Sequence, residues 1–390
     1  PILNKGNIHI EEPELEALVK KVVNSGKLKA YATVQEADVY IIAVPTPVGE
    51  DKKACMDYVE AAVNSTLNLL KAGDLIILES TSPPGTTKDL VVPILKKTNL
   101  KIGEELFVAY CPEKVLPGQI IRELVENKRI IGGINEKSAQ MAKEVYKSFV
   151  KGEIFLTDST TAEMVKVMEN TYRDVNIALA NELAKISYKM GIDAWEVINL
   201  ANMHPRVNLH CPGPGVGGHC ISVDPWFIVE KNPDLAVLIR EAREINNSMP
   251  EFTYNLVLEQ VRNIPSPKIT VLGITYKPDI DDIRESPAVE IVNMLESNPR
   301  LRVSICDPHV KGFNNKLVSL EEALQDSDCI LLAVNHKEFG SIDPADVARL
   351  VNSKIIIDTR NVLNKTAWEE NGFKYVLLGE GKEKVYKVIR

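Results

Sequence analysis

The sequence predicts an α/β protein with two parallel-sheet domains joined by a central helical domain. Strand-helix-strand patterns occur near the start of the chain, similar patterns recur near its end, and a long amphipathic segment separates them. The 390 residues, 45% of them hydrophobic and 26% charged, suffice for two or three globular domains. We place the first α/β domain at residues 1–157, the helical domain at residues 158–262 and the second α/β domain at residues 263–390.

Two apolar runs near the start predict the first α/β domain. EADVYIIAVPTP (residues 36–47) is ended by turn residues, as expected for a strand that is buried on both faces of a parallel sheet. DLIILESTSPPGTT (residues 74–87) repeats this pattern, and the amphipathic stretch between the two predicts a crossover helix. Together they have the rhythm of a βαβ unit.

The second α/β domain is predicted because this layout recurs. SLEEALQDSDCILLAVNHKEF (residues 319–339) has the same order as ATVQEADVYIIAVPTP, a short acidic helix and then a buried strand. SKIIIDTRNVL (residues 353–363) echoes DLIILESTSPP, so a gene duplication is a reasonable hypothesis. RNIPSPK (residues 262–268) predicts a linker that leads into KITVLGITYKP, the first strand of this domain.

The segment at residues 158–191 predicts one long helix. Thr160 and Glu163 have the spacing of a capping box, and Gly191 is a natural stop. At 100° per residue, one face carries seven apolar side chains, namely Met164, Met168, Tyr172, Val175, Leu179, Leu183 and Ile186. The opposite face carries four polar ones, Glu163, Lys166, Asn170 and Arg173. This polar stripe is either a solvated face or the lining of a cleft.

Charge and cysteine usage narrow the class of protein. The net charge of -8 argues against a nucleic-acid binder, which would need a basic face. No apolar run of roughly eighteen residues and no basic-then-apolar leader occurs, so we expect a cytoplasmic protein. The six cysteines are too sparse for a disulfide scaffold, and we expect reduced thiols, at positions Cys55, Cys111, Cys211, Cys220, Cys306 and Cys329.

The glycine-rich stretch CPGPGVGGHCISVDP (residues 211–225) allows three interpretations. A dinucleotide-binding turn would need G-x-G-x-x-G directly after a strand, and neither the spacing nor the strand is present. A zinc site would use His210, Cys211, His219 and Cys220, although adjacent residues seldom ligate one ion and zinc spacings are usually wider. The third interpretation is the seat of a nucleophile.

The nucleophile interpretation assigns the chemistry to Cys220. If a helix begins at about Ile221, Cys220 lies at its N-terminus, where the helix dipole and free amides favour a thiolate. Asp224 then lies one turn further on, on the same side. A cysteine and a carboxylate so placed suit covalent catalysis on an aldehyde followed by hydrolysis. The competing interpretation is a buried structural cysteine.

These residues, with five further motifs in order, resemble the UDP-glucose/GDP-mannose dehydrogenase family over nearly the whole chain. The motifs are IAVPTP, ESTSPPGTT, YCPEKVLPG, AEMVKVMENTYRDVNIALANEL, HPRVNLHCPGPGVGGHCISVDPWF and GITYKPDIDDIRESPA. The resemblance implies two Rossmann-like domains around the helical one, and oxidation of C6 of a nucleotide sugar to a carboxylate with two NAD and one water. We expect no metal. We expect the protein to form a homodimer or a larger homo-oligomer.

The resemblance also implies roles for single residues. Cys220 would be the nucleophile that forms a thiohemiacetal and then a thioester, and Asp224 and Lys166 would hold and activate water. Lys166 would also stabilise oxyanion charge. Other residues are expected to complete the catalytic and substrate-binding cluster, namely Thr81, Asn170, Glu113 and Gly217.

For the substrate, Arg206 resembles an arginine that crosses the dimer interface, while Lys277 and Arg360 resemble cations of the nucleotide-binding domain. A diphosphate needs such local positive groups in an acidic protein. For NAD, the expected contacts lie at the carboxyl ends of strands and in the second α/β domain, at Thr46, Pro47, Ser80, Thr81 and Arg284.

Two features depart from the family pattern. The family opens with a strand and a glycine-rich turn, which residues 1–40 do not supply. The chain starts with Pro1, so we expect a missing natural beginning, or else a protein that only binds a nucleotide sugar. Pro117 stands where members acting on UDP-glucose often have a second glutamate. YCPEKVLPG and HPRVN favour UDP-N-acetylmannosamine as substrate, with UDP-N-acetylglucosamine and UDP-glucose as alternatives.

Overall fold

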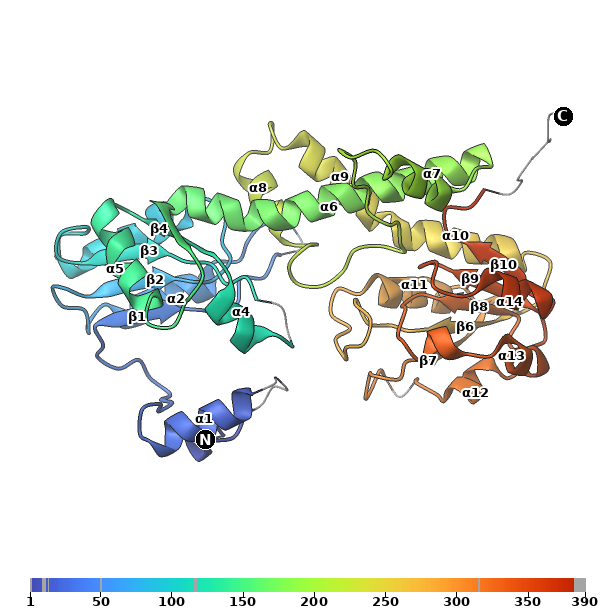
Figure 1. Ribbon diagram of the computed structural model, residues 1–390, viewed down its shortest axis with the longest axis horizontal. Helices are drawn as coiled ribbons and strands as arrows, with labels where there is room; N and C mark the ends of the chain where they lie inside the picture. The colour runs from blue at the N-terminus through green and yellow to red at the C-terminus, as the bar shows by residue number, and fades with distance from the viewer. Residues whose placement is uncertain are drawn as a thin grey trace. The chain divides into compact units, whose positions relative to one another are not determined.

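The computed structural model describes residues 2–8, 12, 14–49, 51–115, 118–314 and 316–381 (Figure 1). Pro117, at the expected substrate-selecting position, lies outside the described residues. The chain divides into two compact units: Pro1–Glu169 with Trp226–Leu235, and Asn170–Pro225 with Ala236–Arg390. The domain boundaries expected at 157/158 and 262/263 stay a prediction.

The first unit is built on a five-stranded sheet in the order β1-β2-β3-β4-β5. Its strands are β1 (Val39–Ile42), β2 (Leu75–Leu78), β3 (Phe107–Tyr110), β4 (Arg129–Gly133) and β5 (Ile154–Asp158). Strands β1 to β3 are parallel to one another, as are β4 and β5, but β4 runs antiparallel to β3. The start of β4 therefore lies at the carboxyl end of β3.

Alternate side chains of these strands enter two apolar cores, one on each face of the sheet. Ile76 and Leu78 of β2 belong to one core, and Leu75 and Ile77 to the other. β2 is fully buried, as predicted, but β1 is an edge strand and leaves Ile41 48% exposed. The helices of this unit are α1 (Leu15–Asn24), α2 (Asp57–Thr66), α3 (Val92–Leu95), α4 (Ile120–Glu126) and α5 (Glu136–Tyr146), with the short 3₁₀ helices η1 (Leu3–Lys5) and η3 (Lys96–Thr98) and the π-helical segment η2 (Thr87–Val91).

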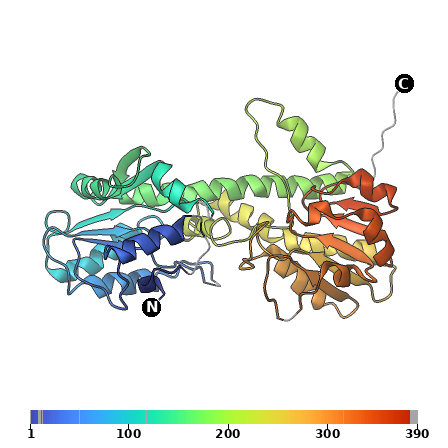
Figure 2. The ribbon, with the colours of Figure 1, turned by 60° about the horizontal axis from the view of Figure 1, so that its bottom comes forward.

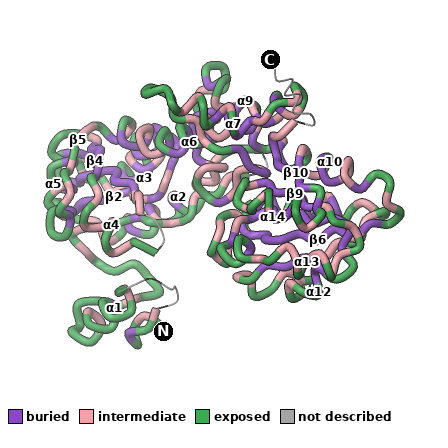
Figure 3. The backbone as a smooth tube through the Cα atoms, turned by 45° about the vertical axis from the view of Figure 1, so that its right-hand side comes forward, coloured by how far each residue is buried: buried purple, intermediate pink, exposed green. Residues whose placement is uncertain are grey.

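The second unit contains an all-parallel five-stranded sheet in the order β10-β9-β8-β6-β7. Its strands are β6 (Lys268–Leu272), β7 (Arg302–Cys306), β8 (Cys329–Leu332), β9 (Ile355–Asp358) and β10 (Lys374–Leu377). The predicted echo is confirmed in that β8 and β9 are parallel neighbours, as β1 and β2 are in the first unit. Figure 3 shows the buried strand β6 within its rim of exposed loops.

Helices cover both faces of this second sheet. One core combines Ile269 and Leu331 with helix residues such as Ile291, and the other combines Ile330 and Ile356 with residues of the shorter helices. The loop at 262–267 links α10 to β6, as predicted. The helices are α9 (Val237–Asn247), α10 (Met249–Val261), α11 (Pro287–Glu296), α12 (Leu320–Leu324), α13 (Pro344–Leu350) and α14 (Lys365–Glu370), with the turn η4 (Phe339–Ser341).

The central segment contains the predicted long helix, α6 (Ser159–Met190), which Figure 2 shows as one continuous helix. The shorter helices α7 (Ala194–Ala201) and α8 (Asp224–Lys231) follow it. The capping-box prediction is wrong: Asp158, not Thr160, caps α6, accepting from the Thr161 backbone N–H at 3.0 Å. No helix among the described residues is both long and apolar enough to cross a membrane.

Helix α6 exposes part of its apolar face and buries polar side chains, the reverse of an ordinary amphipathic helix. Four members of the predicted apolar face are exposed by 43–57%, namely Met168, Tyr172, Leu179 and Ile186. The buried side chains are mostly polar or small. Of the predicted polar stripe, Glu163 and Asn170 are buried, at 0% and 3% exposure. Such burial is stable only when each polar group has a partner.

Most buried polar groups of α6 have partners, in both units, although Asp174 Oδ2 and Ser187 Oγ have none among the described residues. In the first, the Glu163 carboxylate accepts from the Gly85 N–H at 2.5 Å and from the N–H and hydroxyl of Thr87 at 2.7 and 2.6 Å. Burial raises the pKa of Glu163, and these donors oppose that shift. In the second, Arg243 donates to Asp174 at 2.5 Å, and Asn246 donates to the same carboxylate at 2.8 Å.

We predict that Glu163→Gln lowers the free energy of unfolding by about 2–3 kcal/mol, because an amide NH₂ would face backbone donors that the carboxylate now satisfies. Urea denaturation measures this difference. Glu144→Gln is the control, since Glu144 is exposed and its 3.2 Å pair with Lys147 contributes little. Equal effects of the two substitutions would contradict the role of Glu163.

Candidate active site

The glycine-rich loop of the second unit presents Cys220 at its end. The thiol is exposed, and none of the six cysteines forms a disulfide. The predicted helix start at Ile221 is wrong by three residues, because α8 begins at Asp224. A turn fills the gap: the Asp224 N–H donates to the Cys220 carbonyl at 2.8 Å, so the two residues are one helical turn apart, as expected.

Asp224 is a buried carboxylate held by helix α6. It is 3% exposed and accepts from the Asn170 side-chain amide at 2.5 Å. Asn170 in turn accepts from the Arg173 guanidinium. The structure thus brings together three of the sequence-predicted residues, Cys220, Asp224 and Asn170, with Arg173 behind them. A fixed carboxylate near an exposed thiol can orient a water molecule or a hydroxyl group.

The loop before Cys220 lies against the segment that follows β6. A Cβ on Gly217 would come within 2.2 Å of the Glu285 carbonyl, so only glycine fits this approach. His219 lies 3.5 Å from Asp282, whose carboxylate also binds the Arg284 guanidinium at 2.7 and 2.9 Å. Arg284 lowers the pKa of Asp282 to about 2. The predicted NAD contact Arg284 is therefore exposed but already paired within its own unit.

Arg360 lies beside the same loop, directly after β9. Its Nη1 occupies the space that a side chain at Gly213 would need, 2.7 Å from an added Cβ. Burial lowers the pKa of Arg360 to about 10, opposed by the carboxylate of Asp358, and the group remains a cation at neutral pH. Asp358 also orders this turn, accepting from four backbone N–H groups at 2.7–3.0 Å, those of Arg360, Asn361, Val362 and Leu363.

Lys277 is exposed on the loop after β6, and a buried network holds that loop. The Thr275 hydroxyl donates to the Lys277 carbonyl at 2.8 Å, and His336 accepts from the Asp279 N–H at 2.9 Å. His336 also lies 3.1 Å from Asp307. Lys277 and Arg360 thus both follow strands of the second sheet at its carboxyl edge, where ligands of open α/β sheets bind.

The distances between possible ligand atoms argue against the zinc site considered for the glycine-rich stretch. Across the described residues, Asp279, His309 and His336 form the group whose ligand atoms all lie within 4.8 Å of one another. The quartet at positions 210, 211, 219 and 220 forms no such group. In His336 the Nδ1 atom already accepts from a backbone N–H, so that cluster is explained by hydrogen bonding within the fold.

In the first unit, two predicted NAD contacts meet at the carboxyl ends of β1 and β2. The Thr46 hydroxyl donates to the Thr81 carbonyl at 2.7 Å, and Pro47 is exposed beside it. Ser80 is buried, and its hydroxyl accepts from the Val44 N–H at 2.8 Å and donates to the Val44 carbonyl at 2.7 Å. Ser80 therefore supports the loop of Thr46 from beneath.

Two residues near Glu113 were missed by the sequence analysis. Arg129, 5% exposed, donates to Glu113 at 3.2 Å and lies 4.0 Å from Glu79. Tyr146 donates to Glu79 at 2.8 Å, and burial raises the pKa of Glu79. One buried guanidinium thus holds Glu113 beside a second acid. The sequence gives little indication of this contact, because Arg129 is a single arginine at the start of a strand, 16 residues from Glu113.

The remaining predicted residues have less defined surroundings. Lys166 is half-buried on α6, four residues before Asn170, and so on the same side of the helix. Arg206 is exposed on the loop after α7, with its guanidinium 3.5 Å from the His204 ring. Lys166 belongs to the first unit and Asn170 to the second.

Three domain profiles of one family match the chain. The NAD binding domain matches residues 2–150, the central domain residues 160–248 and the UDP binding domain residues 270–365. The three profiles in this order are those of an NAD-dependent UDP-sugar dehydrogenase. The chain belongs to the UDP-glucose/GDP-mannose dehydrogenase family.

Individual relatives agree over almost the full length. A UDP-N-acetyl-D-mannosamine dehydrogenase of Methanococcus vannielii is 50% identical over 97% of this chain and 88% of that protein. An NDP-N-acetyl-D-galactosaminuronic acid dehydrogenase of Ralstonia solanacearum is 44% identical over 92% and 87%. The solved UDP-D-ManNAc dehydrogenase of Pyrococcus horikoshii superposes with a TM-score of 0.90 at 42% identity, covering 97% of this chain and 90% of that one.

The first unit fits a dinucleotide at one edge. The exposed loop of Thr46 and Pro47, tied to Thr81, offers a surface at the carboxyl ends of β1 and β2. Residues 1–169 contain no G-x-G-x-x-G. The loops of Thr46 and Thr81 stay the predicted NAD contacts of this unit.

We predict that Asn170→Asp shifts the acid limb of the kcat/KM profile upward by about one pH unit or more. The new carboxylate would face Asp224, and two like charges raise the pKa of one acid. A site that needs ionised Asp224 then loses activity at a higher pH. Asn170→Ala is the control, because it removes the donor without adding charge. An acid limb unchanged in folded Asn170→Asp would contradict the coupling.

Proposed function

We propose that this protein oxidises UDP-N-acetyl-D-mannosamine at C6 to the uronate, in two NAD-dependent steps on one active site. The observation that carries this proposal is the exposed thiol of Cys220 one turn before the buried carboxylate of Asp224, itself held by Asn170. A four-electron oxidation without release of an aldehyde needs such a nucleophile.

The proposed reaction has two oxidations at C6 and one hydrolysis. NAD, when bound, accepts a hydride in each oxidation. After the first oxidation, Cys220 Sγ adds to the aldehyde carbon and forms a thiohemiacetal, which the second oxidation converts to a thioester. Water then attacks the thioester carbonyl, the C–S bond breaks, and the sulfur leaves as thiolate. The atoms balance, since C6 loses two hydrides and gains the oxygen of one water.

Charged groups support these steps. Asp224, fixed by Asn170, orients the attacking water and takes its proton, while the Lys166 ammonium stabilises the oxyanion. Thr81 belongs with Asn170 to the hydrogen-bonded cluster around this water, and Glu113, to which Arg129 donates, acts at the thioester stage. Arg360 and Lys277 bind the diphosphate, and Gly217, packed against the Glu285 carbonyl, keeps the loop in place for the substrate.

The choice of sugar rests on the relatives. The proteins at 50% and 42% identity described above carry names for UDP-N-acetylmannosamine, whereas the one at 44% is named for N-acetylgalactosaminuronic acid. N-acetylated sugars are common to all three names. We therefore rank UDP-N-acetylmannosamine first and keep UDP-N-acetylglucosamine and UDP-glucose as alternatives.

The apolar stripe on α6 supports a homodimer. Tyr172, Leu179 and Ile186 are seven residues apart and 47–57% exposed. Heptad spacing forms a seam along one side of a helix, and a seam of this kind pairs with a second helix. A second copy of the chain offers the same seam, and a symmetric dimer would cover both. In such a dimer Arg206 reaches the partner's substrate.

We predict two NADH for each UDP-N-acetylmannosamine at the end point with excess NAD. Cys220→Ser should lower steady-state acid formation by about 10³-fold or more, because no thioester can form. Cys211→Ser is the matched control, an exposed thiol of the same loop. One NADH per sugar would overturn the thioester mechanism. No turnover with this sugar but turnover with another would correct the substrate, and none with any sugar would favour a protein that only binds nucleotide sugars.

We predict that Ile186→Asp converts the dimer to a monomer, because a charge would be buried at the seam. Light scattering after size exclusion measures the mass. Leu235→Asp is the control: Leu235 is 84% exposed but lies outside the stripe, and the mass should stay that of the dimer. A dimer in both variants would contradict the assignment of the seam.

A further inference from the structure

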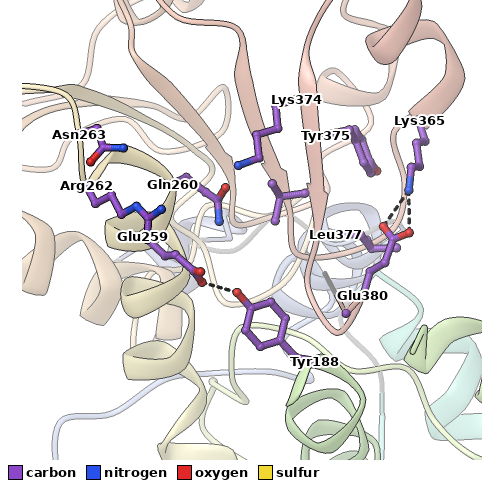
Figure 4. A pocket seen from close by; sticks show the side chains of 12 residues that line it. Tyr188, Glu259, Gln260, Arg262, Asn263, Lys365, Lys374, Tyr375, Leu377 and Glu380 are labelled. Carbon is purple, nitrogen blue, oxygen red and sulfur yellow. Dashed lines mark hydrogen bonds and ion pairs between the residues drawn. The ribbon is translucent and has the colours of Figure 1, made fainter. Parts of the chain in front are cut away.

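A cavity of about 600 Å³ lies in the second unit, and its lining contains none of the residues assigned above to substrate or NAD. Its walls are the end of α10 and the edge strand β10, and Tyr188 of α6 contributes from below (Figure 4). In Figure 4 the Lys374 amine extends from β10 toward the side of Gln260 and Arg262. Cavities of this size hold small molecules.

The charges around the cavity favour an anion. Both acids that line it are engaged: Glu259 accepts from the Tyr188 hydroxyl, and Glu380 binds the Lys365 amine at 2.7 and 2.8 Å. Arg262 and Lys374, by contrast, have no carboxylate within 4.0 Å in the part of the chain that the structure describes. Two cations therefore face one cavity without a counter-charge from the described residues.

The donor set narrows the class of anion. A guanidinium binds phosphate through two parallel N–H bonds, and an ammonium adds a point charge. A single phosphate is much smaller than the cavity, so the remaining volume suits the organic part of a phosphate ester. Gln260 lines this volume, and its side-chain oxygen has no donor among the described residues. A sugar hydroxyl would supply one after rotation of the amide.

The cavity is connected to the substrate-binding turn. Tyr375, which lines it, donates its hydroxyl to Asp358 at 2.7 Å. The same Asp358 carboxylate orders the turn that carries Arg360. Lys365, at the other end of that turn, also lines the cavity, and an anion would compete with Glu380 for it. Occupation of the cavity thus acts on both ends of the segment 358–365.

We propose that this cavity is an effector site for a small phosphorylated sugar or nucleotide, and that its occupation changes the affinity of the Arg360 turn for the substrate. The binding part stands by itself. The coupling part rests on the proposed function, since it takes Arg360 as a substrate contact. Ligand and substrate share no residue, so the coupling runs through Tyr375 and Asp358.

Binding is tested with inorganic pyrophosphate by isothermal titration calorimetry on the full chain. Pyrophosphate can also enter the UDP site. Binding to the cavity is therefore the heat of binding that is present in the wild type and lost in Lys374→Glu. We expect that variant to weaken one class of site by at least about tenfold. Lys354→Glu, an exposed lysine whose amine donates to the Asn371 carbonyl, should leave binding unchanged. Equal binding in wild type and both variants would overturn the site, and so would no binding at millimolar concentration.

Coupling is tested by the dissociation constant for UDP, measured with and without pyrophosphate. Pyrophosphate that competes directly with UDP changes this constant in Lys374→Glu as well. The change that pyrophosphate causes from the cavity should disappear in that variant. Tyr375→Phe should keep the Lys374-dependent binding and lose its effect on UDP, because only the hydroxyl bond to Asp358 is removed. An undiminished effect in Tyr375→Phe would contradict the route. If UDP does not bind at all, the proposed function fails while the calorimetric test of the cavity still stands.

Discussion

The buried polar side of helix α6 is the constraint on which the second unit depends. Asp174 is inaccessible and receives donors from Arg243 and Asn246, and Asn246 accepts from Asn181 at 2.8 Å. Asn181 then accepts from the Gly213 N–H at 2.9 Å, so the network ends on the glycine-rich loop. Removing one member would leave a buried polar atom of its direct neighbour without a partner, which costs about 1–3 kcal/mol.

This network explains why the site can combine rigid and exposed parts. The loop is fixed at Gly213 by a hydrogen bond from its N–H to the Asn181 side chain, at Gly217 by close packing against the Glu285 carbonyl and at Cys220 by the turn that precedes α8. The thiol of Cys220 at its end is left accessible. Catalysis benefits from groups whose position is set before the substrate arrives, since reorganisation then costs nothing during the reaction.

Sequence patterns predicted where strands and helices lie better than they predicted which of their faces are buried and which distant residues they contact. Strand β2 and helix α6 follow from an apolar run and from length and stop signals, which are local. Periodicity shows that α6 has two faces but not which one is buried, because that depends on Asp174 meeting Arg243, 69 residues away. Arg129 was missed for the same reason: its partner Glu113 comes near only once β4 turns antiparallel to β3.

The boundary between the two compact units falls between Glu169 and Asn170, inside the hydrogen-bonded ladder of α6. A chain cut there would expose four backbone carbonyls on one side and four N–H groups on the other. Each of the two new helix ends would then need its own capping groups or water to satisfy them. A fragment that is to keep the fold of one unit is therefore better cut in a loop than inside α6.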